Sequence, residues 1–297
     1  MTDNILLKGC GTALFTPFKG GGTAPEVDYE TFVENVRRQV GAGIDFLVPL
    51  GTTGETPTLS DAEKIRVLTL AKENAEGRPV VAGVGTNSIP GTLANIRLLT
   101  VADAYLVVVP YYNKPPQRGL YEYFKAIAGE TDKPIILYNV PGRTGTNMDA
   151  ETTLRLAEDV PNIIAVKEAS GKIDQVKTIL KHRPKGFIVL SGNDDDTLEL
   201  MKGGAEGVIS VASNVCPDLM EAFTTAALRK EWGKAERYEE HLKPLFHALF
   251  VEPNPIPGKA AMARMGLMEN SLRLPLVEAT EQTDNLINKV LEDLWKK

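Results

Sequence analysis

The 297-residue sequence has few of the residues from which metal sites and disulfide scaffolds are built. It contains two cysteines, Cys10 and Cys216, and three histidines, His182, His241 and His247. The cysteines lie far apart in the chain, and the histidines are not grouped with carboxylates at metal-binding intervals. We therefore expect neither a disulfide framework nor a metal site.

Long hydrophobic runs and an excess of positive charge are also missing. No apolar stretch approaches the roughly 20 residues needed to cross a bilayer, and Met1–Asn4 lacks the basic start of a secretory signal. The formal net charge of −6 disfavours nucleic acid or an anionic membrane as the main partner. We expect a cytoplasmic protein in which local Lys and Arg groups bind any anionic ligand.

Short apolar segments alternate with segments of helical periodicity over most of the chain. This alternation predicts right-handed βαβ units and a parallel sheet. Eight such units fit an α/β fold of the (β/α)8 TIM-barrel type, which typically takes about 250 residues. No Gly-x-Gly-x-x-Gly follows the first strand, which disfavours a dinucleotide-binding fold. The eight predicted strands are Thr12–Thr16, Phe46–Pro49, Val80–Val84, Tyr105–Pro110, Ile135–Tyr138, Ile163–Lys167, Phe187–Leu190 and Val208–Val211.

Beyond about Ser213 the pattern is helical only. The helices predicted between the strands include Tyr29–Val40, Asp61–Asn74, Leu120–Glu130, Asp149–Glu158, Ile173–Leu180 and Asp194–Lys202. The helices predicted after the last strand are Leu219–Arg229, Lys234–Leu249, Lys259–Met265 and Glu278–Trp295. We expect a barrel catalytic domain over residues 1–220 and a C-terminal helical extension over residues 221–297.

Lys167 closes the sixth predicted strand, an apolar segment bounded by Pro161 and Gly171. Side chains alternate along a strand, so Ile163, Ala165 and Lys167 should share one face. If this face lines the barrel, desolvation lowers the pKa of the amine and makes it a nucleophile toward a carbonyl carbon. The alternative is that Lys167 points into water, as most lysines do.

Other polar side chains follow strands that end at the same mouth of a barrel. The glycine-flanked pair Thr52 and Thr53 follows the second strand and suits a carboxylate or phosphate, although an ordinary turn has the same composition. Tyr111 and Tyr112 follow the fourth strand, where they either reach the mouth or simply pack. The seventh and eighth strands, which end near Gly192 and Ile209, offer backbone groups and little side-chain chemistry.

The fifth strand carries Tyr138, which should point inward beside the strand that holds Lys167. A phenol next to an amine that forms a carbinolamine can pass protons. Arg143 follows in a glycine-flanked loop, Gly142–Gly145, where its guanidinium can bind a substrate carboxylate or remain solvated. Together with the two threonines, these residues form a set suited to Schiff-base chemistry on a 2-oxo acid.

With these motifs the sequence resembles the dihydrodipicolinate synthase family, also called the 4-hydroxy-tetrahydrodipicolinate synthase family, of the pyruvate-dependent class I lyases. The likeness runs nearly end to end, and its most specific parts are GTTGE at 51–55, PYYN at 110–113, YNVPGRTG at 138–145 and VKEASG at 166–171. The resemblance implies a homotetrameric enzyme without a cofactor that condenses pyruvate with L-aspartate 4-semialdehyde in lysine and diaminopimelate biosynthesis.

The resemblance also implies a role for each motif residue. Lys167 forms the imine with pyruvate, and Thr53 holds the pyruvate carboxylate. A proton relay is formed by Tyr138, Thr52 and Tyr112, with Tyr112 contributed by a neighbouring subunit. The remaining implied substrate-binding groups are the Arg143 guanidinium, for the semialdehyde carboxylate, and the carbonyls of Gly192 and Ile209.

Two alternatives to this function remain open. One is a related lyase acting on a sugar acid, of the N-acetylneuraminate or 2-keto-3-deoxygluconate type. The other is a catalytically silent barrel that only binds a ligand or partner. The resemblance also implies a departure from family members that lysine inhibits, because the positions of their lysine-binding His and Glu residues correspond here to Asp61, Lys64 and Gly91, although Asn87 and Tyr111 remain. A cationic Lys64 would repel the amines of lysine, so we expect weak inhibition or none.

Overall fold

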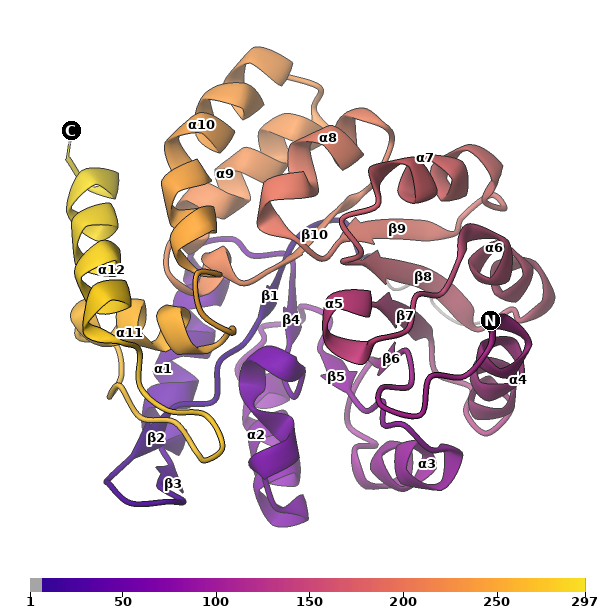
Figure 1. The fold of residues 1–297 in the computed structure, drawn as a ribbon, viewed down its shortest axis with the longest axis horizontal. Coiled ribbons are helices and arrows are strands. Elements are labelled where there is room, and N and C mark those ends of the chain that lie inside the picture. The colour runs from indigo at the N-terminus through magenta and orange to yellow at the C-terminus, as the bar shows by residue number, and fades with distance from the viewer. Residues whose placement is uncertain (1–6, 297) are drawn as a thin grey trace.

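The protein is described here from a computed structural model, which covers residues 7–296. The segment Met1–Asn4, which lacks the basic start of a secretory signal, lies outside the described residues. Figure 1 shows the strands in the centre, with helices around them and the last helices packed on one side.

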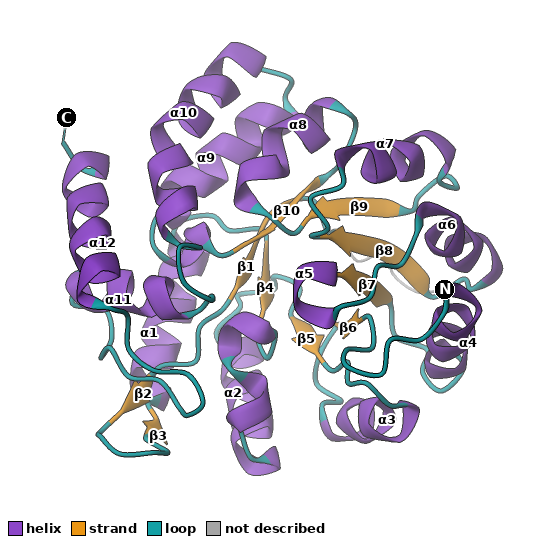
Figure 2. Ribbon diagram, in the orientation of Figure 1, coloured by secondary structure: helices purple, strands orange, loops and turns teal. Residues whose placement is uncertain are grey.

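Eight parallel strands form the barrel predicted from the sequence. In spatial order the sheet is β4-β1-β10-β9-β8-β7-β6-β5, and an isolated parallel bridge between Leu47 and Val80 joins its two ends. The TIM-barrel prediction is therefore confirmed (Figure 2). The strands are β1 (Gly9–Ala13), β4 (Phe46–Val48), β5 (Val81–Gly83), β6 (Ala104–Val108), β7 (Ile135–Asn139), β8 (Ile163–Glu168), β9 (Ile188–Ser191) and β10 (Gly207–Ser210).

The helices cover the outside of this barrel and continue beyond it. The helices that follow the strands along the chain are α1 (Tyr29–Gly41), α2 (Asp61–Glu73), α3 (Ile89–Leu98), α4 (Gln117–Ala128), α5 (Pro141–Thr144), α6 (Ala150–Asp159), α7 (Ile173–His182), α8 (Thr197–Lys202) and α9 (Pro217–Leu228). The chain ends in α10 (Trp232–Ala248), α11 (Ile256–Arg264) and α12 (Glu281–Leu294). The predicted boundary at residue 220 falls inside α9, and the division into two domains stays a prediction.

Some elements of the structure were absent from the sequence prediction, among them a pair of short strands and a helix. A small antiparallel pair, β2 (Phe18–Lys19) and β3 (Glu26–Val27), follows the first strand. Helix α3 begins after Ser88, whose side chain accepts a hydrogen bond from the Gly91 N–H, and Pro90 lies in its first turn. An N-cap serine followed by an early proline is a helix-start signal that the sequence does contain.

Strand β1 begins three residues before the predicted Thr12 and ends at Ala13. Gly11, which precedes the predicted strand, lies inside β1. A Cβ at Gly11 would lie 2.1 Å from the Phe46 ring, so this ring fills the place that a side chain would take. Glycine is required there by close packing rather than by a turn.

Apolar side chains of the strands form two separate clusters, one inside the barrel and one between the strands and the helices. Ala165 and Ile136 belong to the inner cluster, whereas Val166 belongs to the outer one. The prediction for Ile163 is wrong, because it packs in the outer cluster. The cause is a register shift at the start of β8, where Ile163 pairs with Ile135 but Ala165 pairs with Ile136. This irregularity inserts one residue, so the alternation resumes correctly only from Ala165 onward.

Candidate active site

Lys167 and Tyr138 lie side by side on neighbouring strands. They are paired in the register of β7 and β8, and both side chains are buried. The Lys167 Nζ lies 4.4 Å from the centre of the Tyr138 ring. The parallel register thus brings the amine and the phenol together on the inner face of the barrel, as the alternation of side chains predicts.

The Lys167 amine is desolvated, with 6% of the residue exposed. The pKa of this amine is lowered from 10.5 to about 8, chiefly by burial. The Asp194 carboxylate acts in the opposite direction and raises the pKa, whereas the positive charge of Arg143 lowers it further. Because the charged form loses its hydration, a much larger fraction of the amine is neutral near pH 8 than for a solvated lysine. The alternative of a lysine pointing into water is therefore wrong.

Gly192, directly after β9, leaves room for the Lys167 side chain. A Cβ at Gly192 would lie 3.0 Å from the Lys167 Cε and 2.6 Å from the Ala169 Cβ, so a larger residue would press on the lysine side chain. Ile209, on β10, is buried and belongs to the inner cluster. The structure thus places both residues on the inner wall of the barrel.

Thr52 and Thr53 form one turn of 3-10 helix, Thr52–Gly54, directly after β4. The Thr52 hydroxyl interacts with the Tyr138 phenol, which it stabilises in the ionised form. Burial nevertheless raises the pKa of Tyr138, with the Arg143 charge and the Thr52 hydrogen bond acting in the opposite direction. Tyr138 therefore stays protonated at neutral pH and is ready to donate a proton.

Thr53 is buried, and its hydroxyl accepts a hydrogen bond from the Asn254 side-chain amide at 2.9 Å. Asn254 lies just before α11, in the C-terminal extension. Its carbonyl also accepts a hydrogen bond from Arg143 at 3.1 Å. Asn254 thus holds two of the predicted substrate-binding residues, a role that the sequence analysis missed.

Arg143 lies on α5, a single helical turn where a glycine-flanked loop was expected. Gly145 ends the turn in the left-handed conformation, at φ 70°. The glycine is used as a helix C-cap, which is its most common role after a helix. The loop prediction is therefore wrong, and the guanidinium projects from a short, hydrogen-bonded helix toward the mouth of the barrel.

Tyr111 and Tyr112 differ in their surroundings. Tyr111 lines the cavity at the mouth, together with Thr52, Tyr138 and Arg143. Tyr112 does not line it and is 88% exposed, with a left-handed backbone at φ 74°. A non-glycine residue in this conformation costs free energy and persists where its surroundings hold it, and here the Tyr112 N–H donates a hydrogen bond to the Thr144 carbonyl at 3.4 Å.

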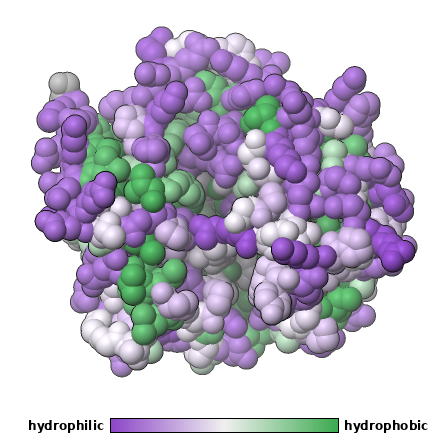
Figure 3. All heavy atoms as spheres, in the orientation of Figure 1, coloured by the Kyte–Doolittle hydropathy of each residue, from purple (hydrophilic) through white to green (hydrophobic). Residues whose placement is uncertain are grey.

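A cavity of about 340 Å³ lies at this mouth and is the size expected for a small-molecule site. Its wall also includes Lys64 and Asn95. In Figure 3 the same face of the molecule is largely hydrophilic, and apolar side chains gather beside the C-terminal helices α11 and α12. Among the predicted site residues, the cavity is lined by Thr52, Tyr138 and Arg143, whereas Lys167 and Thr53 do not line it and Lys167 lies behind it against the Tyr138 ring.

Asp194, like Asn254, has a role at the site that the sequence did not predict, since it was expected only at the start of a helix. It is buried after β9, and its Oδ2 accepts hydrogen bonds from the backbone N–H groups of Val211 and Ala212 at 3.1 and 2.9 Å. Burial raises the pKa of Asp194, although its hydrogen bonds with Ser210 and with backbone N–H groups act to lower it. Its charge is the largest attraction acting on the Lys167 ammonium.

Over residues 7–296, no group of three or more His, Cys, Asp and Glu side chains is arranged to hold a metal ion. Over the same range, no helix is both long and apolar enough to span a membrane.

A parallel barrel with a desolvated lysine beside a phenol has the groups of an enzyme that attacks carbonyl carbons through an amine. The comparison with known proteins narrows this class. Residues 6–294 match the model of the Dihydrodipicolinate synthetase family. The chain belongs to this family, which confirms the resemblance drawn from the sequence motifs.

Individual relatives agree with the family match. A 4-hydroxy-tetrahydrodipicolinate synthase of Thermotoga neapolitana is 46% identical over 294 residues, which cover 97% of this chain and 99% of the relative. A monomeric dihydrodipicolinate synthase variant has a TM-score of 0.94 at 44% identity, covering 97% and 96% of the two chains. A chloride-inhibited dihydrodipicolinate synthase of Acinetobacter baumannii in complex with pyruvate has a TM-score of 0.94 at 37% identity, covering 97% and 99%.

Proposed function

We propose that the chain condenses pyruvate with L-aspartate 4-semialdehyde, the reaction of a 4-hydroxy-tetrahydrodipicolinate synthase. Membership of the family and the names of its close relatives make the chain a lyase of this kind. The observation on which the mechanism depends is the Lys167 amine, whose pKa is lowered to about 8 beside the Tyr138 phenol. The sugar-acid lyase alternative is not favoured, since relatives at this identity carry the synthase name.

The proposed mechanism begins at Lys167. Its neutral amine attacks the keto carbon of pyruvate, and the carbinolamine loses water to form an iminium ion. Tyr138 and Thr52 carry the protons that the nitrogen loses and the departing hydroxyl gains. Loss of a methyl proton gives an enamine, whose carbon attacks the aldehyde carbon of the second substrate. The amino group of this substrate then attacks the imine carbon, closes the ring and releases Lys167.

Carboxylate binding accompanies each step. We assign the pyruvate carboxylate to the Thr53 hydroxyl and N–H, and the semialdehyde carboxylate to the Arg143 guanidinium, which is a bidentate donor. The carbonyls of Gly192 and Ile209 complete the pocket. The described network supports this assignment, because Asn254 contacts both Thr53 and Arg143 and fixes the distance between the two carboxylate positions.

The test of this function is reductive trapping. Borohydride in the presence of pyruvate should leave a reduced pyruvate adduct on the peptide that contains Lys167, detectable by mass mapping. The variant Lys167→Ala serves as the control and should take up no adduct at this peptide. A wild-type protein that gains no adduct, or gains it on another lysine, would contradict the proposal.

We further propose a homotetramer in which Tyr112 completes the proton relay of a neighbouring subunit. The support is the high exposure and left-handed backbone of Tyr112 in the single chain. The fold alone does not fix the assembly, since a monomeric variant has a closely similar structure. Sedimentation velocity measures the oligomer directly. Mixed oligomers of Tyr112→Phe and Lys167→Ala subunits should regain activity, because some sites then combine an intact lysine with an intact tyrosine.

A further inference from the structure

Glu55 and Lys259 form a buried ion pair behind the Thr52–Gly54 turn. The Lys259 Nζ lies 2.5 Å from the Glu55 Oε1, and both side chains are fully buried. Glu55 directly follows the turn that carries Thr53, whereas Lys259 lies on α11. The pair therefore joins the C-terminal extension to the loop at the mouth of the barrel.

The other polar atoms of this pair are also engaged. The second oxygen of Glu55 accepts a hydrogen bond from the Arg273 backbone N–H at 3.1 Å. Lys259 donates to the Ser271 carbonyl at 3.0 Å, and its Nζ lies 4.0 Å from the centre of the Phe18 ring. Burial lowers the pKa of Lys259 to about 8, although the Glu55 charge opposes this change. The pair is thus closely enclosed, which leaves Glu55 little freedom to move.

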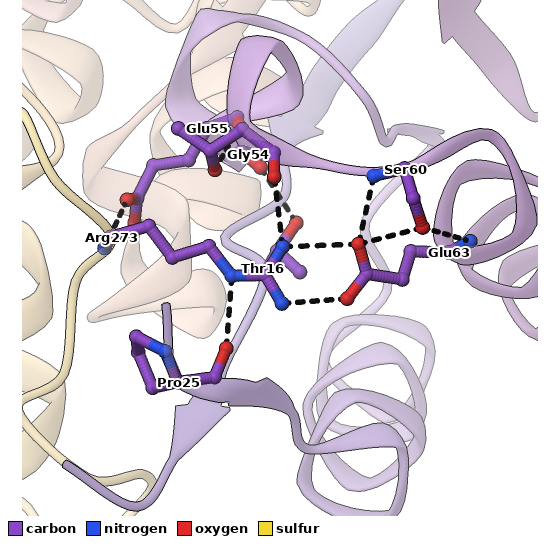
Figure 4. Close-up of polar contacts among 8 residues, drawn as sticks. Thr16, Pro25, Gly54, Glu55, Ser60, Glu63 and Arg273 are labelled. Atoms are coloured by element: carbon purple, nitrogen blue, oxygen red, sulfur yellow. Dashed lines mark hydrogen bonds and ion pairs between the residues drawn. The ribbon is translucent and has the colours of Figure 1, made fainter. Parts of the chain in front are cut away.

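Arg273 adds further contacts between the C-terminal part of the chain and the segment that follows the Thr52–Gly54 turn, as Figure 4 shows for its ion pair with Glu63. Its guanidinium donates to the two Glu63 carboxylate oxygens at 2.6 and 3.0 Å and to the Thr58 carbonyl at 2.8 Å. On the opposite side, the Thr16 hydroxyl donates to the Gly54 carbonyl at 2.8 Å. Segments far apart in the chain therefore meet around one short loop.

The backbone of this loop is strained at both ends. Leu50 and Glu55, which flank Gly51–Gly54, have left-handed φ angles of 60° and 52°. Such conformations in residues other than glycine cost free energy and persist only where the surroundings impose them. A buried ion pair adds little net stability compared with well-packed apolar residues of the same size. What it does supply is a fixed geometry, here at the residue that ends the strained turn.

We propose that the Glu55–Lys259 pair is a positioning device for the active site. It holds Glu55 in its left-handed conformation and thereby sets the Thr53 hydroxyl and N–H at the distance that pyruvate requires. This inference rests on the proposed function, in which Thr53 binds the pyruvate carboxylate. Neither Glu55 nor Lys259 touches the substrate, so their effect is exerted through Thr53.

The experiment removes both charges together, in the variant Glu55→Gln/Lys259→Met, so that no unpaired charge remains buried. The pyruvate concentration that gives half-maximal borohydride trapping on Lys167 is measured together with the melting temperature. We expect this concentration to rise by about tenfold or more, because small displacements of a binding group are costly. The adduct at saturating pyruvate should match that of the wild type, and the melting temperature should stay close to it.

Lys177→Met is the matched control. Lys177 also pairs with a glutamate, Glu199, at 2.8 Å, but both side chains are about half exposed. This variant should keep the wild-type concentration dependence. One lysine–glutamate pair is buried beside the site and the other is exposed. A change in the half-maximal pyruvate concentration seen only in the Glu55→Gln/Lys259→Met variant therefore comes from the position of the pair and not from the loss of a charge in general.

The outcomes distinguish the two proposals. A wild-type protein without an adduct on Lys167 would refute the proposed function itself. A labelled wild type together with a double variant whose half-maximal concentration stays within about twofold would overturn the positioning role and leave the pair purely structural. If the double variant does not fold, Glu55→Asp takes its place, since it keeps the charge but withdraws it by one methylene. An unchanged concentration dependence in this variant likewise overturns the proposal.

Discussion

Lys167 and Tyr138 are held together by the pairing of β7 with β8, which sets the amine 4.4 Å from the centre of the phenol ring. Since both residues are on strands of one sheet, their separation depends on backbone hydrogen bonds rather than on a flexible loop. Sites built on such rigid elements keep their geometry well. The pair is therefore suited to repeated proton transfer during imine formation.

The pH dependence of pyruvate use should report the Lys167 amine. Its pKa is lowered to about 8, so the amine is protonated and inert below this pH and becomes neutral as the pH rises through it. We expect kcat/KM for pyruvate, which reflects the free enzyme, to rise about tenfold per pH unit below 8 and then level off. A value that continued to rise toward pH 10 would indicate a solvated lysine instead.

Asp194 should set the position of this pH profile. Its carboxylate raises the pKa of Lys167 against the effect of burial, so Asp194→Asn should lower that pKa and shift the profile to more acidic pH. The asparagine oxygen can still accept the backbone bonds from Val211 and Ala212. The same pH titration measures the shift, and an unmoved or alkaline-shifted profile would contradict it. A merely structural role would change the amount of folded protein but not the profile.

Tyr138→Phe should slow the chemistry while leaving the site folded. The ring remains beside Lys167, but the phenolic proton is lost, and general acid–base groups contribute about 10²–10⁴-fold to rate. We expect kcat to fall within this range, with little change in melting temperature because the buried ring is kept. Steady-state kinetics together with thermal unfolding test both parts. A kcat near that of the wild type would exclude Tyr138 from the relay.

Arg143→Ala should discriminate between the two substrates. The Arg143 charge lies at the mouth of the cavity, and hydrogen bonds to charged groups contribute about 1.5–3 kcal/mol. The KM for aspartate semialdehyde should therefore rise by about 10- to 100-fold, and that for pyruvate far less. Equal effects on both constants would count against the assignment of Arg143 to the second substrate.

The barrel and the central pair were accessible from the sequence because they depend on periodicity. Alternation along β7 and from Ala165 onward in β8 is a local property, so the inward direction of Tyr138 and Lys167 followed directly. The register shift that reverses Ile163 is not encoded in such a pattern. Asn254 and Lys259 were missed because their partners, Thr53 and Glu55, lie about 200 residues away, and contacts of that separation have no local signal.

Lysine should inhibit the enzyme weakly or not at all. At the positions where the resemblance implies lysine binding in sensitive relatives, Lys64 lies in the wall of the cavity, and its ammonium is 3.2 Å from the Asp61 carboxylate. Gly91 supplies a backbone N–H to the Ser88 cap of α3 and has no side chain to receive an amine. A cationic ligand would therefore meet a like charge and find the nearby carboxylate already paired, which disfavours binding. Initial rates measured over a lysine titration test this expectation, with the wild-type rate in added sodium chloride as the ionic-strength control. Half-inhibition at sub-millimolar lysine would show that the amines are bound by other groups.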